Sequence, residues 1–514
     1  MTQEITTDPA LGRLADAVLI PPFPGGMAPD WIRAALGDGL GGVTLFGPNV
    51  LDRGQLARLT ASLRGAVAGS AGADEPVIAI DEEGGDVTRI SHQTGSDYPG
   101  NAALGAVDDV TLTRSVYAAM GTELAGLGIN LDLAPAVDVN TAADNPVIGT
   151  RSFGSDPELV ARHAAAAVAG LQSAGVAACA KHFPGHGSTT ADSHLVLATV
   201  DAPLSVLRAR DLPPFEAAIA AGVRAIMPSH LRIPELTGEL PASLSRRAQT
   251  ELLRGELGFT GVIVSDGLEM RAVSVPYGIP EAAVQAVIAG TDLLCLGRDQ
   301  DHLSFLAVRA ALVDAVRSGR LPGTRLEEAA ARVTELRTWI AAHGPAASQL
   351  VRAYAADGRR AADADGSPIG LAAARRALAI DGALPILNRP LVVQLVPPSN
   401  LAVGTVPWGL GPWLADGSYR EISTGTPSAD LAAVVARLLT VALGRSLVIV
   451  VRDAHRYPVA SQAVSQLVTA RPDAIVVEMG LPVWRPATGR YVASYGAAQS
   501  NAQAAAEALG LTDR

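Results

Sequence analysis

Short apolar runs alternate with longer amphipathic stretches along the first two-thirds of the chain. Each run stops at a Gly, Pro or acidic residue and precedes an Ala/Leu/Arg-rich stretch at helical spacing. The eight runs cover residues 17–20, 42–46, 77–80, 129–133, 176–180, 225–227, 261–264 and 292–296. They are apolar throughout, as parallel strands buried on both faces should be. Eight such units predict an α/β fold, a (β/α)8 barrel of the TIM type rather than an open doubly wound sheet.

The pattern changes near residue 344. An Ala/Arg-rich helical connector leads through residues 363–368, whose Asp, Gly, Ser and Pro content is typical of a linker. Beyond it, apolar runs at 391–395, 447–451 and 474–478 again alternate with helical stretches. The predicted organisation is a catalytic barrel over residues 1–344, a helical linker over 345–370, and a smaller C-terminal α/β sandwich domain over 371–514.

Composition narrows the class of protein. The 40 basic and 51 acidic side chains give a net charge of −11, and there is no basic stripe, which argues against nucleic acid or an anionic membrane as the main partner. We find neither a signal peptide nor an apolar stretch long enough to span a membrane. Cys179 and Cys295 lie inside apolar runs, which indicates buried thiols rather than a disulfide. We expect a reduced, cytoplasmic protein.

Two sequence patterns resemble a dinucleotide site and a metal site, but the residues around them do not fit either one. Residues 37–42 match G-x-G-x-x-G, but this segment ends a helix and opens a strand, the reverse of a dinucleotide site. His182 and His186 are four residues apart, but Pro184-Gly185 between them prevents the helix that would put both on one face. The sequence therefore predicts neither a cofactor nor a metal.

Polar residues gather where the predicted strands end, which is where barrel enzymes carry their active sites. They are Asp81 to Gly85, Asp132, Asp138, Lys181, His182, His230 and Asp266. Carboxylates, a lysine and histidines at one rim suit a polyhydroxylated ligand such as a sugar. Taken alone, Asp81 and Asp266 fit helix N-caps about as well as ligand contacts.

The densest polar segment is Lys181-His182-Phe183-Pro184-Gly185-His186-Gly187, followed by Asp192-Ser193-His194. Lys181 is the single lysine among the 40 basic side chains. A compact ammonium can bond two neighbouring hydroxyls in a way that the planar guanidinium cannot, although an exposed lysine without a role is the alternative. Asp192 and His194 suggest a carboxylate–imidazole pair, in which the Asp fixes the tautomer; the alternative is a capping Asp beside a surface His.

This segment resembles the K-H-F-P-G-H-G…D-S-H signature of bacterial β-N-acetylglucosaminidases of glycoside hydrolase family 3. Other segments resemble the family in the expected order: Asp81-x-Glu83-Gly84-Gly85-x-Val87-x-Arg89, Leu131-Asp132-Leu133-Ala134-Pro135, Asn145-Pro146 leading to Arg151-Ser152-Phe153-Gly154, and Ser265-Asp266 with Met270. Val476-Val477-Glu478-Met479-Gly480 and Tyr495-Gly496 resemble the C-terminal sandwich of two-domain members. The resemblance is strong to about residue 300 and weak beyond 370.

The resemblance implies a role for each matching residue. Asp266 is implied as the catalytic nucleophile, His194 as the general acid/base and Asp192 as its partner. The positions implied to hold the N-acetylglucosamine ring are Asp81, Arg89, Arg151, Lys181 and His182. The implied reaction is retaining, through a glycosyl-enzyme intermediate, with a histidine in place of the usual second carboxyl group.

Three departures from the family pattern bear on the substrate. Glu82 and Asp86 make the Asp81 segment more acidic than usual, and Gly267 after the nucleophile is small. The Ser-Asp-Trp form of family β-glucosidases is absent, which favours an N-acetylated sugar.

We therefore expect an exo-acting β-N-acetylglucosaminidase that releases terminal GlcNAc from muropeptide or chitin-type oligosaccharides. A phosphorylase that transfers GlcNAc to inorganic phosphate is an alternative, because a neutral His194 repels phosphate less than a carboxylate would. A non-catalytic sugar-binding protein is the other, and it would be expected to lack Asp266 or His194. The sequence makes no prediction for the aglycone, the role of the C-terminal domain or the oligomeric state.

Overall fold

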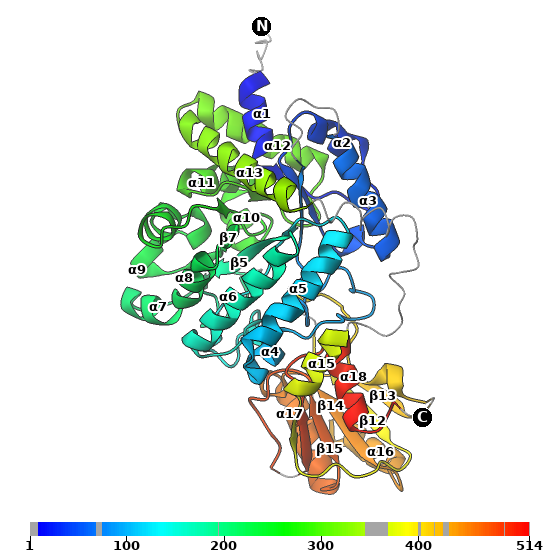
Figure 1. Cartoon of the computed structure of the whole chain (residues 1–514). Helices are drawn as coiled ribbons and strands as arrows, with labels where there is room; N and C mark the ends of the chain where they lie inside the picture. The colour runs from blue at the N-terminus through cyan, green and yellow to red at the C-terminus, as the bar shows by residue number, and fades with distance from the viewer. Residues whose placement is uncertain are drawn as a thin grey trace. The chain divides into compact units, whose positions relative to one another are not determined.

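The computed structural model describes residues 9–67, 75–193, 195–344, 368–398, 402–415, 417–424, 431–487 and 489–512 (Figure 1). Internal contacts divide the chain into two units. The first comprises Met1–Glu82, Thr113–Val139 and Asp156–Asp363, and the second comprises Glu83–Leu112, Asn140–Ser155 and Ala364–Arg514.

The second unit includes two segments, Glu83–Leu112 and Asn140–Ser155, that the predicted boundaries placed with the barrel. Most of the predicted linker falls on residues 345–367, outside the described residues. The domain boundaries therefore stay a prediction.

Each of the eight apolar runs contributes a strand to the first unit. The strands are β1 (Leu19–Ile20), β2 (Gly42–Leu45), β3 (Val77–Ile80), β4 (Leu131–Asp132), β5 (Ala177–Phe183), β7 (Ala225–Pro228), β9 (Val262–Ile263) and β10 (Leu294–Cys295). Six of them form one parallel sheet in the order β2-β3-β4-β5-β7-β9, and β1 pairs in parallel with β10.

Hydrogen bonds connect the strand pair to both edges of the six-stranded sheet. The amide of Thr44 in β2 donates to the Pro21 carbonyl beyond β1 (3.3 Å), and the Ser265 amide after β9 donates to the Leu293 carbonyl before β10 (2.8 Å). The first unit is therefore an α/β fold with a curled parallel sheet.

Helices follow these strands. Those of the first unit are α1 (Pro9–Ala17), α2 (Asp30–Gly37), α3 (Arg53–Gly65), α6 (Pro157–Ser173), α7 (Leu204–Arg210), α8 (Pro213–Ala220), α9 (Pro234–Thr237), α10 (Arg271–Tyr277), α11 (Ile279–Ala289), α12 (His302–Arg317) and α13 (Gly323–His343). Helix α5 (Val110–Gly126) begins in the second unit and continues into the first, and a π-helix covers Arg247–Glu256. A small parallel pair, β6 (Ala198–Thr199) and β8 (Leu231–Arg232), lies outside the curled sheet.

Side-chain caps fix where several helices begin. The carboxylates of Asp52, Asp156 and Asp301 accept backbone N–H bonds at the starts of α3, α6 and α12. Pro157 is the first residue of α6, a position where the missing N–H of proline costs no helical hydrogen bond.

Inward-facing strand residues build the core of the first unit. Ile20, Val77, Leu131, Cys179 and Val262 belong to one buried cluster, to which α13 adds Val333, Leu336 and Ile340. Both cysteines are buried free thiols, as predicted.

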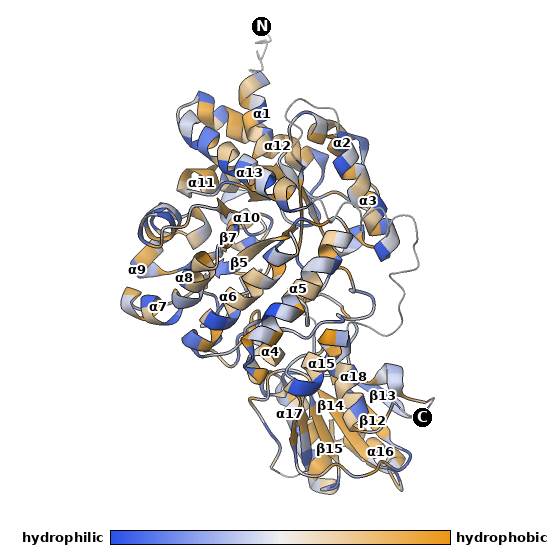
Figure 2. Cartoon of the chain, viewed as in Figure 1, coloured by the Kyte–Doolittle hydropathy of each residue, from blue (hydrophilic) through white to orange (hydrophobic). Residues whose placement is uncertain are grey.

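The second unit contains a six-stranded sheet in the order β11-β16-β15-β14-β12-β13. Its strands are β11 (Ala379–Asp381), β12 (Leu391–Val396), β13 (Tyr419–Ser423), β14 (Leu447–Val451), β15 (Ile475–Glu478) and β16 (Arg490–Ala493), all parallel except that β11 runs antiparallel to β16. The three predicted runs are thus confirmed as β12, β14 and β15. Figure 2 shows the apolar character of these strands.

Helices cover both faces of this sheet. Leu391 and Val393 pack with residues of α16 (Leu431–Val441) and α17 (Pro458–Ala470) on one face. Val392 and Val448 pack with residues of α18 (Gln499–Ala508) on the other. The unit also contains α15 (Pro368–Ala377) and α4 (Asn101–Val107).

No single helix in the described residues is long and apolar enough to cross a membrane. Helices α10 and α11 meet the length and composition criteria only as a pair, which is bent by 107°.

Candidate active site

Lys181 and Asp81 form an ion pair between the carboxyl ends of two strands. Lys181 lies near the end of β5 and Asp81 directly follows β3, and the Lys181 Nζ is 2.7 Å from the Asp81 Oδ1. The Lys181 side chain is 3% exposed and that of Asp81 is 20% exposed. The alternative of an exposed lysine is therefore wrong: the chain's single ammonium group is buried against a carboxylate.

Asp132 ends β4 and is completely buried. Its Oδ1 accepts the backbone N–H of Glu82 at 3.0 Å. Burial, reinforced by the negative charges of Glu82 and Asp81, raises the pKa of Asp132 well above its usual value, against the opposing effect of Lys181. Asp132 is therefore harder to ionise than an exposed aspartate.

Asp138 holds the two histidines of the motif. Its Oδ2 lies 2.8 Å from the Nδ1 of His182, and its Oδ1 accepts the backbone N–H groups of His182 (3.3 Å) and His186 (2.6 Å). Burial by itself would raise the pKa of Asp138, but the interactions with His182 and His186 hold it below its usual value. An ionised Asp138 thus orients the His182 ring through its Nδ1.

His186 organises the loop that follows β5. Its Nδ1 is 2.8 Å from the Thr189 hydroxyl and its Nε2 is 2.8 Å from the Ser193 hydroxyl. The described residues contain no group of three or more His, Cys, Asp or Glu side chains that could hold a metal ion. His186 therefore acts as an internal anchor of this loop.

The predicted acid/base pair is only partly described. Asp192 is half-buried, and His194 lies outside the described residues. Both roles stay predictions that rest on the resemblance.

Asp266 follows β9, and its Oδ1 accepts the backbone N–H of Gly267 at 2.8 Å. The next helix, α10, starts at Arg271 with Met270 in the cap position, and no described helix starts after Asp81 until α4 at Asn101. The helix-cap alternatives for Asp266 and Asp81 are therefore wrong.

His230 supports the Asp266 segment from the neighbouring strand. Its Nε2 donates to the carbonyl oxygen of Gly267 (3.0 Å), which leaves Nδ1 to accept the Ser243 hydroxyl proton (2.6 Å). The sequence placed His230 at a strand end but gave it no role. Its position two residues after β7 could have indicated a role at the site. The sequence could not predict its partner, the carbonyl of Gly267, which lies 37 residues away.

These groups follow strands of one parallel sheet. Asp81, Asp132, Lys181 and Asp266 come from the carboxyl ends of β3, β4, β5 and β9, which belong to the sheet of order β2-β3-β4-β5-β7-β9. Because the carboxyl ends of parallel strands lie at the same edge of a sheet, the four side chains come from one edge of the curled sheet. Burial raises the pKa of Cys179, which lies within β5.

Arg89 and Arg151 belong to the second unit. The guanidinium of Arg151 binds both carboxylate oxygens of Glu83, with Nε to Oε2 at 2.8 Å and Nη2 to Oε1 at 2.7 Å, and donates to the Val147 carbonyl. Arg89 donates to the Ala402 carbonyl at 3.3 Å. Glu83 thus fixes the Arg151 head in a bidentate geometry.

The unusual acid Asp86 also has partners in the second unit. Its carboxylate accepts hydrogen bonds from the Thr150 hydroxyl (2.5 Å) and the Ala497 amide (3.0 Å), and lies 2.9 Å from the Arg452 guanidinium. The acidic residue that departs from the family pattern at position 86 therefore forms an ion pair with Arg452.

The sequence matches the family described as "Glycosyl hydrolase family 3 N terminal domain" over residues 30–336. Because this match covers more than half of the chain, the protein belongs to glycosyl hydrolase family 3.

Individual relatives support the same family. A β-hexosaminidase A of Pseudoalteromonas piscicida is 34% identical over 381 residues, which cover 70% of this chain and 63% of that protein. The solved structure of a family 3 β-N-acetylglucosaminidase from Paenibacillus sp. str. FPU-7 matches with a TM-score of 0.84 at 33% identity, covering 98% of this chain and 96% of that one. A β-glucoside phosphorylase matches at 17% identity with a TM-score of 0.73, covering 97% and 92% of the two chains, which shows a shared fold alone.

Proposed function

We propose that this protein is a retaining exo-β-N-acetylglucosaminidase that releases terminal GlcNAc from muropeptide or chitin-type oligosaccharides. The observation that carries the proposal is the buried Lys181–Asp81 pair at the carboxyl edge of the parallel sheet, the edge from which Asp266 also extends, in a chain of glycosyl hydrolase family 3. The hexosaminidase names of the relatives support the N-acetylated sugar.

In this mechanism Asp266 is the nucleophile. Its carboxylate attacks the anomeric carbon while His194, acting as general acid, protonates the departing glycosidic oxygen. The product is a glycosyl ester on Asp266. His194 then removes a proton from water, the water oxygen attacks the anomeric carbon, and the ester bond breaks to regenerate the carboxylate and free GlcNAc. Asp192 stabilises the imidazolium form of His194.

Other groups hold the sugar. The ammonium of Lys181 and the carboxylate of Asp81 can bond neighbouring hydroxyls, and Asp138 presents the His182 ring. The resemblance also implies Arg89 and Arg151 as ring contacts, and Glu83 holds the Arg151 head. The His230–Gly267 bond keeps the Asp266 backbone in place.

Finer features of the fold are part of the same proposal. We infer that the curled sheet closes as a (β/α)8 barrel, supported by the hydrogen bonds from β1 to β2 and from the end of β9 to the segment before β10. The helices on both faces of the second sheet support an α/β sandwich. The domain boundaries and the cytoplasmic location also stay predictions.

Product analysis tests the reaction. Chitobiose and a muropeptide should each yield free GlcNAc, in phosphate and in a non-nucleophilic buffer alike. The names of the relatives do not favour the phosphorylase alternative, and GlcNAc-1-phosphate as the main product would overturn hydrolysis. Binding of GlcNAc without turnover of either substrate or of an aryl GlcNAc would instead indicate the non-catalytic sugar-binding protein.

A further inference from the structure

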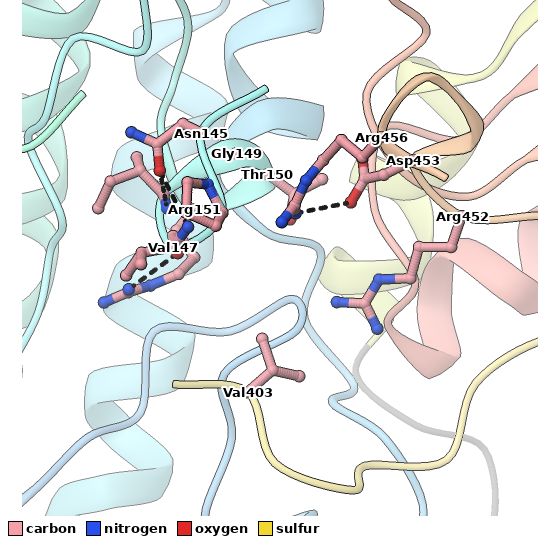
Figure 3. Close-up of a pocket in the computed structure, with 11 residues that line it drawn as sticks. Asn145, Val147, Gly149, Thr150, Arg151, Val403, Arg452, Asp453 and Arg456 are labelled. Atoms are coloured by element: carbon pink, nitrogen blue, oxygen red, sulfur yellow. Dashed lines mark hydrogen bonds and ion pairs between the residues drawn. The ribbon is translucent and has the colours of Figure 1, made fainter. Parts of the chain in front are cut away.

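The second unit contains a pocket that the proposed reaction does not use as a whole. Its walls come from the segment 145–151, from Val403, and from Arg452, Asp453 and Arg456 (Figure 3). The space amounts to about 250 Å³, including the part open to solvent. Figure 3 shows Arg452 and Arg456 extending from one wall toward the segment that carries Thr150 and Arg151, with Val403 below them.

This pocket lies at the position in an open parallel sheet where ligands most often bind. Strand β12 has β13 on one side and β14 on the other, so the chain reverses its direction across the sheet between β12 and β14. Arg452 directly follows the end of β14, and Val403 comes from the segment after β12. Crevices outside the carboxyl ends of the strands at such a switch point are general ligand sites.

The charge of the lining is positive, although the chain as a whole carries −11. Three guanidinium groups, those of Arg151, Arg452 and Arg456, face a single lining carboxylate, that of Asp453. Their other acidic partners, Glu83 and Asp86, are not part of the lining, and their side chains are only 2% and 1% exposed.

The arginine heads differ in how tightly the protein holds them. Arg452 lies 2.9 Å from the Asp86 carboxylate, and its guanidinium carbon is 5.9 Å from the centre of the Trp408 ring, so its head is fixed. The guanidinium carbon of Arg456 is 5.6 Å from the centre of the Tyr457 ring, but its Nη1 is 4.0 Å from the Asp453 Oδ2, at the outer limit for an ion pair. Among the three arginines of the lining, Arg456 therefore has the longest ion pair.

The turn that presents these arginines is rigidly built. The side-chain oxygens of the buried Glu478 accept hydrogen bonds from the backbone N–H groups of Asp453 (2.7 Å), Ala454 (3.2 Å) and Gly480 (2.8 Å). Asp453 has a φ of 53°, which a non-glycine residue adopts only when its surroundings fix it. A Cβ at Gly480 would lie 2.2 Å from the Asp453 Oδ1, so only glycine fits beside this turn. Such preorganisation lowers the ordering cost of binding a ligand.

We propose that this pocket binds a small anionic group, a carboxylate or a phosphate, through the guanidinium groups of Arg452 and Arg456. Planar guanidinium groups bind both kinds of oxyanion with charge-assisted, bidentate hydrogen bonds. The anion has two possible sources, an acid group carried on a saccharide or free inorganic phosphate. The inference does not depend on the proposed hydrolysis, because its test measures binding.

Calorimetric titration of the full chain tests the proposal, with inorganic phosphate and with N-acetylmuramic acid, a sugar that carries a carboxylate. At low ionic strength we expect at least one of them to bind, and Arg456→Gln to weaken that binding at least tenfold. Binding of phosphate alone indicates a free anion, and binding of the sugar acid alone indicates a saccharide carboxylate. Arg437→Gln, on the exposed face of α16, is the matched control and should bind as the parent protein does.

Thermal denaturation keeps the test decisive if Arg456→Gln folds poorly. The anion that binds should raise the Tm of the parent protein at constant ionic strength, because a ligand of the native state stabilises it. Arg456→Lys keeps the charge but loses the planar fork, so the rise should be smaller in that variant. Absence of binding by both anions, or equal binding by the parent protein and Arg456→Gln, would overturn the proposal.

Discussion

Two residues carry most of the proposed chemistry, and both owe their position to the end of a strand. Lys181 is a single ammonium in a chain that otherwise uses arginine, and it lies buried against Asp81. Asp266 lies at the end of a buried strand, and His230 holds the carbonyl of the next residue, Gly267. Conservative substitutions at these two residues should therefore change the kinetics of the enzyme without unfolding it.

The first prediction concerns the identity of the cation. Lys181→Arg should lower kcat/KM for an aryl GlcNAc by at least about tenfold. The Lys181 side chain is only 3% exposed, so the larger, planar guanidinium cannot take the place of its compact ammonium. Steady-state kinetics measure this. Arg437→Lys makes the opposite substitution at an exposed position and serves as the control, whose kinetics should equal those of the parent protein. Unchanged kinetics in Lys181→Arg would mean that the single lysine has no part in binding the sugar.

The second prediction concerns the nucleophile. Asp266→Asn keeps an oxygen that can accept the Gly267 N–H bond but removes the attacking carboxylate, so kcat should fall by roughly a thousandfold or more. GlcNAc binding, followed by calorimetry, should change much less than turnover. Substantial residual turnover would contradict the assignment of Asp266.

At the scale of elements, the loop after β4 and the motif after β5 are joined by Asp138. This carboxylate accepts hydrogen bonds from the backbone of both His182 and His186, while the His186 ring anchors Thr189 and Ser193. The loop that leads to the predicted acid/base is therefore built on one buried charge. Both the geometry of the segment after β5 and the stability of the protein should therefore depend on the Asp138 carboxylate.

The third prediction follows from that charge. Asp138→Asn should reduce the free energy of unfolding by about 1–3 kcal/mol near pH 7, because buried polar partners lose their ionised acceptor. The pKa of Asp138 is lower in the folded protein than in the unfolded chain, so its contribution is complete above the unfolded value of about 4 and disappears as the pH falls through the folded value.

Denaturant titrations of both proteins at several pH values measure the difference. The deficit of Asp138→Asn should shrink as the pH is lowered below about 4. A deficit that stays constant with pH would show that the charge of Asp138 does not contribute to stability.

The fourth prediction concerns the element that supports the arginine pocket. Burial raises the pKa of Glu478 to about 8, so its contribution to stability is complete below the unfolded value near 4.5 and is lost as the pH rises through 8. The stability of the parent protein relative to Glu478→Gln should therefore decline from pH 5 to pH 9. Thermal denaturation across this range measures it, and a rising difference would reverse the assigned sign.

At the scale of the whole molecule, segments far apart in the chain form the second unit together. Asp86, from the segment after β3, accepts a hydrogen bond from the Ala497 amide 411 residues away and pairs with Arg452. The C-terminal region thus supplies partners for a buried acid that lies close in sequence to the proposed sugar-binding residues. A chain that ends at residue 344 would leave that acid without them.

The fifth prediction tests this dependence. In the full chain, Asp86→Asn should lower the Tm, because it removes the charge partner of Arg452. In a chain that ends at residue 344, the same substitution should leave the Tm unchanged or raise it, since Arg452 and the Ala497 amide are then absent. Equal losses in both chains would show that the partners in the C-terminal region do not matter to Asp86.

The strands could be predicted from the sequence because they depend on a local property, the run of apolar residues. The apolar runs give strands because burial on both faces needs unbroken apolar residues, and all eight runs of the first unit and the three of the second contain one. The residues at the strand ends were also predicted, because every parallel strand delivers its carboxyl end to the same rim. The grouping of Glu83–Leu112 and Asn140–Ser155 with the C-terminal region could not be predicted, because it depends on contacts between distant segments.

By itself, the sequence determined which residues form strands, where its single lysine falls and which chemistry its motif offers. Only the tertiary structure decided the partners: Asp81 for Lys181, Asp138 for His182, Gly267 for His230 and Arg452 for Asp86. The physical reason is that apolar periodicity is a local property of the chain. A hydrogen bond or ion pair between distant residues depends on strand order and on burial, which exist only once the chain has folded.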